Sequence, residues 1–456
     1  TAETSLALNY ENLLTTNSAT LAINNPNQVL QDTLKLEVGN LLSLYYLRNL
    51  ALNNPPEVVR GGIAIGSGKS EIIAPTTGGV AANIVSSQIN LDKWLEVFKN
   101  LTNNKNPVAK INAATDASAD NYLPRIVSVK SALINWDIYN FEQVTANLNR
   151  DGNLWRATID SKELAGLIEY RTTANDAKLF ARLSKAYLAS ANQEDVEQVL
   201  DQPSGPPPSV DIEIDNLRLA GRSFGKIQLD ANNRILSNGS REWKINKLVV
   251  TQPFAKLNAT GSWAEVAKVG SFAKRSLLER RRMDLDFKLD IENAGDLITW
   301  IGKEKALRNG KGKLEGNIGW QGSPFQVNFP TLRGQMNLAV QSGQFLKIDM
   351  GAAKLLSVLS LQALPRRLVL DFRDVFSEGF AFDTIKGDVT IAKGVASTQN
   401  LQMSGMNALV LMDGSADIVK ESQNLHIVVI PEISAGGAAL AIVAINPAIG
   451  LSSLLA

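Results

Sequence analysis

The sequence contains no cysteine and only one histidine, His426, among its 456 residues. Without cysteine, the chain can form neither a disulfide framework nor a thiolate metal site. His426 lies in the apolar run NLHIVVIP, which is typical of a strand, so we interpret it as a structural side chain. We therefore expect no metal site, no cofactor and no enzymatic activity.

The sequence also lacks an excess of either charge, because 46 Lys and Arg residues stand against 45 Asp and Glu residues. A nucleic-acid-binding surface normally shows as a basic excess, so we expect no nucleic-acid partner. The first residues, TAETSLALNYENLL, have neither the basic nor the apolar region of a signal peptide, and no initiator methionine. We interpret the chain as the later part of a longer protein.

Nucleotide-binding and catalytic motifs are also missing. The stretch GSGKS (residues 66–70) is similar to the end of a phosphate-binding loop, but Ile63 occupies the position where that motif requires a glycine. The strand-like run EIIAPTTGGV follows instead of a helix, so we predict a glycine turn between strands. Paired carboxylates, as in DLDFKLD and DFRD, fall on the polar side of alternating runs and do not indicate catalysis.

What the sequence has in abundance is alternation of apolar and polar residues. In MDLDFKLDI (residues 283–291) every second residue is apolar and the others are charged, which predicts a half-buried strand. The same period occurs in KLEGNIGW, LRGQMNLAV, WRATI, VDIEI, KLNATGSW and IKGDVTI. Glycine-containing breaks such as RNGKG, QSGQ and AKG separate many of these runs, which favours successive antiparallel strands joined by tight turns. Parallel units would need helical crossovers, for which most gaps are too short.

Few segments have a helical pattern. Residues 89–101 (INLDKWLEVFKNL) and 294–307 (AGDLITWIGKEKAL) are predicted helices, and residues 176–189 (DAKLFARLSKAYLA) fit either a helix or a strand followed by a helical turn. The run DQPSGPPPSVDI is the strongest linker signal, because three consecutive prolines cannot continue a helix or enter a central strand. We place a boundary near residue 205, although one sheet could continue across it.

The last residues, 433–456, carry no charge and are rich in Gly and Ala. Their length is sufficient to span a bilayer, but Asn446 and Pro447 interrupt the run. Three interpretations stay open: short helices packed on the end of the sheet, a tip that touches a membrane, and a transmembrane helix. The alternating strands themselves are compatible with a sandwich, a barrel or an open groove.

One long string suggests a family. The run SLQALPRRLVLDFRDVFSEGFAFDTIKGDVTIAKG (residues 360–394) resembles the C-terminal region of the YhdP-like, AsmA-like family of Gram-negative bacteria. The similarity extends upstream through ALRNGKGKLEGNIGWQGSPFQV and WKINKLVVTQPFAKLNATGSW, and downstream through VVIPEISAGGAALAIVAINPAIGLSSLLA. It is continuous from about residue 150 to the end and looser before that, where GGIAIGSG and INLDKWLEVF carry it.

The resemblance implies a mainly β fold: an elongated, twisted antiparallel sheet curled into an open hydrophobic groove, with a few short helices at the groove and at the C-terminal end. Residues 1–204 would form a groove segment, residues 205–432 the AsmA-like C-terminal β groove, and residues 433–456 an apolar helical tip. Such proteins are bridge-like lipid transfer proteins of the periplasm, anchored in the inner membrane by an N-terminal helix that this chain does not contain. Their C-terminal end would lie near the outer membrane.

The implied function is transfer of phospholipids between the inner and outer membranes, which would support lipid homeostasis and the permeability barrier of the outer membrane. The alternative is a periplasmic scaffold or assembly factor for outer-membrane proteins, with a protein partner in the outer membrane or periplasm. As groove-lining residues we name the apolar positions of four alternating runs: Met283, Leu285, Phe287, Leu289, Ile291, Leu332, Met336, Leu338, Val340, Leu368, Leu370, Phe372, Val389 and Ile391.

The junction LQALPRRLVLDF joins a helical pattern to an alternating one. Pro365 ends the helical pattern, and Arg366 and Arg367 begin the strand-like run. In one interpretation the two arginines only solvate the start of a strand. In the other they lie at the rim of the groove and contact anionic lipid headgroups.

Overall fold

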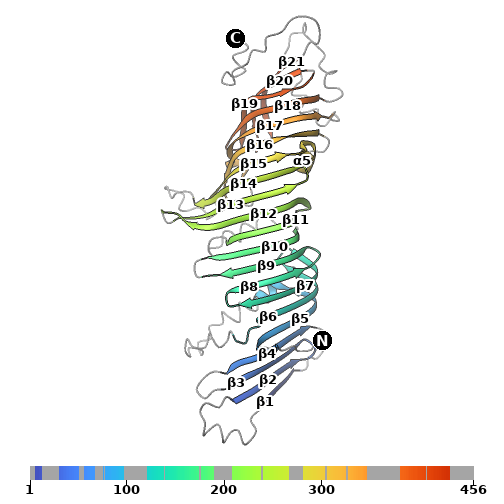
Figure 1. Cartoon of the computed structure of the whole chain (residues 1–456), viewed down its shortest axis with the longest axis vertical. Coiled ribbons are helices and arrows are strands. Elements are labelled where there is room, and N and C mark those ends of the chain that lie inside the picture. The colour runs from blue at the N-terminus through green and yellow to red at the C-terminus, as the bar shows by residue number, and fades with distance from the viewer. Residues whose placement is uncertain are drawn as a thin grey trace. The chain divides into compact units, whose positions relative to one another are not determined.

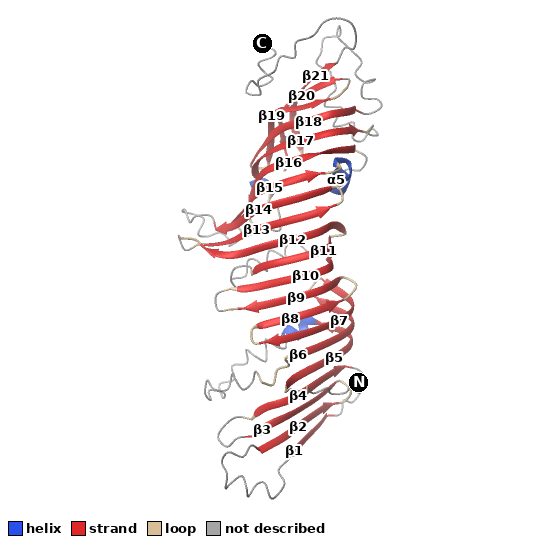
Figure 2. Ribbon diagram, viewed as in Figure 1, coloured by secondary structure: helices blue, strands red, loops and turns tan. Residues whose placement is uncertain are grey.

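The computed structural model describes residues 6–12, 30–50, 56–66, 75–76, 78–96, 121–137, 139–173, 176–188, 208–237, 240–265, 281–302, 306–324, 327–346, 380–406 and 408–431. The chain divides into two compact units. Unit 1 comprises Thr1–Ala191 with Ile212–Gly221, and unit 2 comprises Asn192–Asp211 with Arg222–Ala456. Both are built almost entirely from β-strands (Figures 1 and 2).

The strands of unit 1 pair with their neighbours in chain order. They are β1 (Leu6–Asn12), β2 (Leu30–Val38), β3 (Leu42–Leu50), β4 (Glu57–Gly66), β5 (Gly79–Asn90), β6 (Ile126–Trp136), β7 (Tyr139–Asp151), β8 (Leu154–Asp160), β9 (Leu164–Thr172) and β10 (Ala177–Leu188). The strand β11 (Ser209–Leu219) crosses the division between the units. The pairings are antiparallel except for β4–β5 and β5–β6, which are parallel.

The two parallel pairings depart from the antiparallel order that the sequence predicts. A parallel neighbour requires a long crossover, usually with a helix. Strand β5 runs on to Asn90, and a helix begins at residue 91 and is described to residue 96. The predicted helix at 89–101 therefore starts two residues late, and its last five residues lie outside the described part of the chain. Within the ambiguous segment 176–189, residues 177–188 form a strand, β10, which pairs with β9.

The strands of unit 2 all pair antiparallel, again in chain order. They are β12 (Arg222–Ile235), β13 (Arg241–Gln252), β14 (Ala255–Glu265), β15 (Arg281–Ile291), β16 (Leu307–Gln321), β17 (Arg333–Phe345), β18 (Phe380–Ala392), β19 (Val395–Ser404), β20 (Ala408–Asp417) and β21 (Ser422–Pro431). No described pairing joins β12 to β21, so the sheet of unit 2 stays open. The prediction of a mainly β, curled and open sheet is confirmed (Figure 2).

Register shifts interrupt several strand pairings of unit 2. They occur between Asp230 and Ala231, between Ile245 and Leu248, between Lys386 and Thr390, and between Thr398 and Leu401. Extra residues at such bulges bend a strand and increase its twist. The curl brings apolar side chains of many strands onto one face. Trp243 and Ile391, from β13 and β18, belong to the same buried cluster.

A helix, α5 (Ala294–Ile301), and a 3₁₀ turn, η2 (Phe329–Thr331), interrupt the strands of unit 2. The side chain of Asn293 accepts a hydrogen bond from the Asp296 amide at 3.2 Å, which satisfies one free donor of the first turn. Gly302 ends the helix in the left-handed region, with φ of 103°. The predicted helix at 294–307 is therefore shorter than its pattern, and Leu307 already begins β16.

Candidate functional site

Apolar side chains of unit 2 line up in rows across neighbouring strands. In one row, Leu257, Leu289, Leu314 and Leu338 are direct partners across β14, β15, β16 and β17. Two further rows run beside it: Ala259, Phe287, Gly316, Met336 and Val389; and Gly261, Leu285, Ile318, Gly334 and Ile391. We call these three rows the central rows. Because alternate residues point to opposite faces, all three lie on one face, the apolar face of unit 2.

The central rows are partly exposed on β15, β16 and β17, whereas their members Ala259, Gly261 and Ile391 are buried. Leu285, Phe287 and Leu289 retain intermediate exposure, whereas Met283 and Ile291 at the two ends of the same strand are 2% and 5% exposed. The next strands repeat this pattern, because Met336 and Leu338 are partly exposed and Val340 is buried. The apolar face therefore has two buried borders and a more accessible strip between them.

The structure brings the predicted set of β15 together with the predicted sets of β17 and β18. Phe287 reaches Met336 and Val389 through Gly316 in a single row, and Ile291 and Val340 share a row through Gly312. Leu332, just before β17, is buried in the same cluster as Met283 and Ile391. Their role as lipid-contact residues stays a prediction.

Five other predicted positions cannot be placed. Leu368, Leu370 and Phe372, and the two arginines Arg366 and Arg367, lie outside the described residues. The C-terminal segment 433–456 lies outside them as well.

The sequence reasoning missed the contributions of the intervening strands. Leu257 of β14 and Leu314 and Ile318 of β16 complete the central rows. The signal was present, because KLNATGSW and KLEGNIGW alternate with the same period as MDLDFKLDI. What the sequence could not supply was the register that aligns these runs.

Three tryptophans close one border of the apolar face. Trp243, Trp263 and Trp320 are each at most 5% exposed and belong to one cluster. Their indole N–H groups donate to backbone carbonyl oxygens of Pro208, Gly322 and Ser323, at 3.1, 2.8 and 2.7 Å. Buried indoles with satisfied N–H groups pack as rigid apolar bodies, so this border excludes water.

Phenylalanines and α5 close the other border. Phe380 and Phe382 are 4% and 2% exposed, and Leu297 of α5 packs against their cluster. Trp300, also on α5, donates to the Ser223 carbonyl oxygen at 2.7 Å and meets Phe224 edge to face, with ring centroids 5.2 Å apart. The helix is thereby fixed beside the start of β12.

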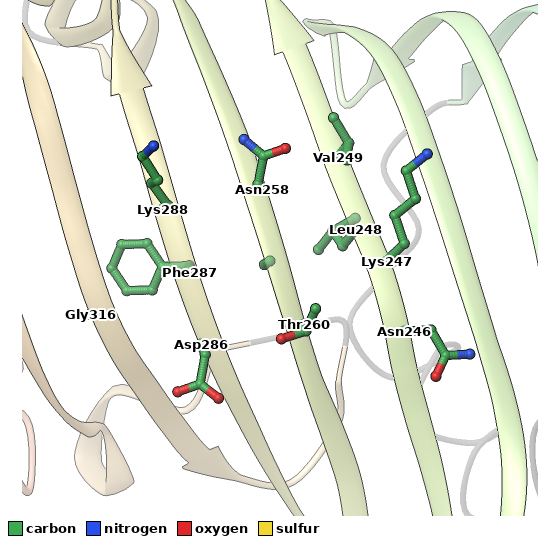
Figure 3. Close-up of a pocket in the computed structure, with 11 residues that line it drawn as sticks. Asn246, Lys247, Leu248, Val249, Asn258, Thr260, Asp286, Phe287, Lys288 and Gly316 are labelled. Carbon is green, nitrogen blue, oxygen red and sulfur yellow. The ribbon is translucent and has the colours of Figure 1, made fainter.

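A hollow of about 420 Å³ lies against β13 to β16. Its lining includes Leu248, Ala259, Phe287 and Gly316, where small residues flank the aromatic ring (Figure 3). Polar neighbours on the same strands, such as Asp286 and Lys288, complete the lining. Because Ala259 and Gly316 are small, the apolar face is hollowed beside the Phe287 ring.

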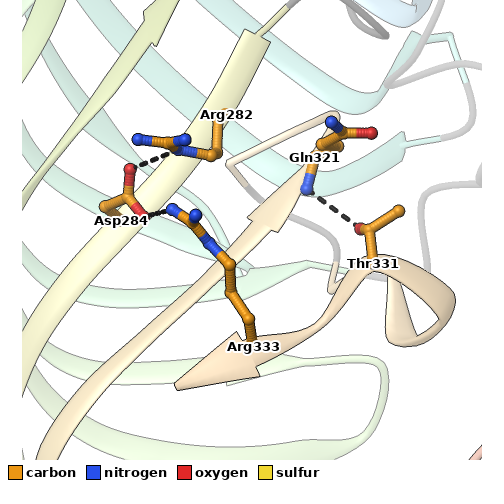
Figure 4. A network of polar contacts seen from close by, with 5 residues as sticks. All are labelled: Arg282, Asp284, Gln321, Thr331 and Arg333. Atoms are coloured by element: carbon orange, nitrogen blue, oxygen red, sulfur yellow. Dashed lines mark hydrogen bonds and ion pairs between the residues drawn. The ribbon is translucent and has the colours of Figure 1, made fainter. Parts of the chain in front are cut away.

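The opposite face of the same strands is polar and carries exposed ion pairs. Asp284 accepts a hydrogen bond from Arg282 Nε at 2.7 Å and forms an ion pair with Arg333 (Figure 4). All three side chains are more than a third exposed, so the pairs contribute little stability. The charged residues thus occupy the side of these strands opposite the central rows.

Asp388 joins three strands on the polar face. It accepts from Asn337 Nδ2 at 2.9 Å and from Asn400 Nδ2 at 2.7 Å. These two hydrogen bonds, with that of Asn337 the stronger influence, hold the pKa of Asp388 below its ordinary value. A charged carboxylate therefore connects β17, β18 and β19.

The chemistry of this site is that of apolar contact. The transfer of each methylene group from water to such a face is favourable by about 0.8 kcal/mol. Within the described residues, no three His, Asp or Glu side chains are grouped so as to hold a metal ion. Among the helices of the described ranges, none has the length and apolarity needed to cross a membrane.

The fold and the site define the class of open β-groove proteins, with one polar face and one partly exposed apolar face. Within that class, the model of the YhdP family, described as "YhdP protein", matches residues 12–456. The chain belongs to this family. It is also similar to the intermembrane phospholipid transporter YhdP of Escherichia coli (strain K12), with 32% identity over 231 residues.

That alignment covers 50% of this chain and 17% of the Escherichia coli protein. The chain therefore aligns with less than a fifth of its relative. No solved structure matches the chain.

Proposed function

We propose that this chain carries phospholipids across the periplasm, between the inner and outer membranes, along the apolar face of its β-sheets. The observation that carries the proposal is the alignment of partly exposed apolar residues in the central rows of unit 2. The relative with 32% identity is an intermembrane phospholipid transporter, which supports the same function here.

The physical argument rests on the cost of exposing acyl chains to water. A chain that leaves a bilayer exposes each methylene at about 0.8 kcal/mol, which forbids unassisted crossing. The central rows lower this cost along their length, and the headgroup stays in water at the open side. Because the central rows offer similar apolar contacts along their length, no single position binds an acyl chain strongly enough to stop its movement. The role requires neither catalysis nor a cofactor.

The groove-lining residues fall into two groups under this proposal. Leu285, Phe287, Leu289, Met336, Leu338 and Val389 would touch the acyl chains directly. Met283, Ile291, Leu332 and Val340 would hold the borders of the strip, and Ile391 would be the buried end of its central row. Arg366 and Arg367 remain candidates for headgroup contact, and neutralising both should weaken transport without unfolding the protein.

Photo-crosslinking at adjacent positions tests which face carries lipid. A photoreactive residue at Phe287 should capture phospholipid, and the same residue at Asp286, on the polar face, should capture about tenfold less. Equal capture from the two positions would refute transport along one face.

Charge insertion tests conduction. Leu338→Asp places a carboxylate in the central rows, whereas Ala339→Asp places one on the exposed polar face of the same strand. We expect Leu338→Asp to lose most of the permeability-barrier function of the outer membrane while the melting temperature stays close to that of Ala339→Asp. If both folded variants maintained the barrier equally, conduction along this face would be wrong, and an assembly role would gain support.

A further inference from the structure

A pair of buried charges lies on the apolar side of β2 and β3 in unit 1. Asp32 and Arg48 are direct partners across these strands, in line with the apolar pairs Leu34–Tyr46 and Leu36–Leu44. Asp32 is 1% exposed and Arg48 is 16% exposed. Charged groups are costly at such positions unless they are paired and hydrogen-bonded.

The pair has bidentate geometry. Arg48 Nε donates to Asp32 Oδ1 at 2.9 Å, and Arg48 Nη2 donates to Asp32 Oδ2 at 2.5 Å. The hydrogen bond to Asp32 is the largest cause that raises the pKa of Arg48 above its ordinary value. The guanidinium therefore stays charged and fixed, with its third nitrogen, Nη1, directed away from Asp32.

Tyr122 occupies the remaining polar positions. Its hydroxyl accepts from Arg48 Nη1 at 3.3 Å, and its backbone carbonyl oxygen accepts from the Tyr46 hydroxyl at 3.0 Å. The rings of Tyr46 and Tyr122 meet edge to face, with centroids 5.2 Å apart. Tyr122 also packs against the cluster of Tyr46, Val58 and Val80. One residue thus supplies an apolar ring and two acceptor oxygens.

The sequence makes room for this arrangement at Gly61. A Cβ atom there would lie 2.4 Å from Cδ1 of Tyr46, so any other residue would push the tyrosine ring away. Burial, with the neighbouring Tyr122 adding to it, raises the pKa of Tyr46, which keeps its hydroxyl protonated as a donor. Two donors on the apolar side of β3 are therefore aimed at the place that Tyr122 fills.

We propose that Arg48 and Tyr46 form a binding station for the phosphate and ester oxygens of a phospholipid, and that Tyr122 occupies this station until a lipid replaces it. The inference rests on the proposed function. Tyr122 presents what a phospholipid would present at this point: an apolar body against the cluster of Tyr46, Val58 and Val80, a hydroxyl oxygen near the guanidinium, and a carbonyl oxygen near a phenol. An amphiphile with an anionic oxygen would give Arg48 a stronger acceptor than a phenol does.

Photo-crosslinking at two positions in the intact protein tests the station. One photoreactive residue replaces Leu44, on the apolar side of β3, and another replaces Leu338, in the central rows of unit 2. Cells are grown with radiolabelled phosphate, so that captured phospholipid is counted directly. The variant Tyr122→Phe removes the hydroxyl that faces Arg48 and keeps the ring, and it leaves both donors of the station in place.

The hydrogen bond from Arg48 to the Tyr122 hydroxyl is worth about fivefold in the ratio of released to occupied station, so losing it should raise that ratio by about fivefold. We expect phospholipid capture at Leu44 to rise several-fold and capture at Leu338 to stay unchanged. Tyr45→Phe, a change on the opposite face of β3, is the matched control and should leave both signals unchanged. Unchanged capture at Leu44, with normal capture at Leu338, would overturn the station and leave the proposed function standing.

A second variant asks whether Arg48 holds the lipid. Asp32→Asn/Arg48→Gln removes both charges together, so that neither is left buried alone. Introduced into the variant that lacks the Tyr122 hydroxyl, it should cancel the gain in phospholipid capture at Leu44. A persistent gain would overturn the role of Arg48. Absence of phospholipid at both Leu44 and Leu338 in every variant would overturn the proposed function together with the station.

Discussion

Both units pair their strands in chain order, and they differ in what lies on the apolar face. In unit 2 the central rows contain only apolar side chains and glycines, and tryptophans and phenylalanines bury the two borders. In unit 1 a buried ion pair interrupts the apolar side of β2 and β3, and Tyr122 covers it. Alternation of apolar and polar residues alone therefore produces a uniform apolar face, whereas one buried ion pair makes a single position on that face chemically different from its neighbours.

Removing one partner of each ion pair gives the largest contrast between the units. Arg48→Ala leaves Asp32 buried without its guanidinium, which should destabilise β2 and β3 by about 3–5 kcal/mol. Arg333→Ala removes an exposed partner of Asp284 and should cost less than about 1 kcal/mol. Hydrogen exchange of the backbone amides measures the two regions separately. Similar losses in both would show that the Asp32 site is open to water.

Alanine substitutions in unit 2 distinguish the buried borders of the apolar face from the accessible strip between them. Met283→Ala removes a side chain that is 2% exposed and should cost about 2–5 kcal/mol, because a cavity remains. Leu289→Ala, in the central rows, should cost roughly half as much, since Leu289 is already partly exposed. Urea denaturation monitored by tryptophan fluorescence gives the free energies of unfolding. If Leu289→Ala were the more damaging change, the strip would be an ordinary packed core.

The smallest expected effects are opposite responses to pH. In unit 1 the pKa of Tyr46 is raised above 10.0, so the stability it contributes is complete below that pH and is lost as pH rises through the folded value. In unit 2 the pKa of Asp388 is lowered from 3.8, so its contribution is complete above that pH and is lost as pH falls through the folded value. Tyr46→Phe should remove the alkaline response and Asp388→Asn the acid response.

Hydrogen exchange at the two pH extremes, followed at β3 and at β18, measures these responses. Each variant serves as the control for the other, because it should alter only its own unit. An acid response that survived Asp388→Asn would assign it to other carboxylates.

The strands of unit 2 could be predicted from the sequence, because their period is regular from Met283 to Ile291 and again from Leu332 to Val340. The sequence did not distinguish a strand from a helix at β10, since the alanines and lysines of DAKLFARLSKAYLA favour a helix by propensity. Pairing with β9 decides the matter, and pairing is a property of the fold. The parallel order of β4, β5 and β6 was likewise hidden, because no local pattern encodes a crossover's partner.

The position of Asp32 was hidden for a different reason. In LQDTLKLEV the aspartate occupies an apolar position and looks like a break in the pattern. Its meaning depends on Arg48 across the hairpin and on Tyr122, which lies far along the chain. A single sequence does not show that these three side chains meet.

Strict pairing in chain order has a consequence for how unit 2 is assembled. Each strand from β12 to β21 is bonded only to the strands next to it in the chain, so its described pairings resemble the nearest-neighbour contacts of a repeat protein. Folding of such a sheet can begin at any neighbouring pair of strands and spread in both directions. A hairpin added or lost in evolution would change the length of the surface and leave the registers on either side intact.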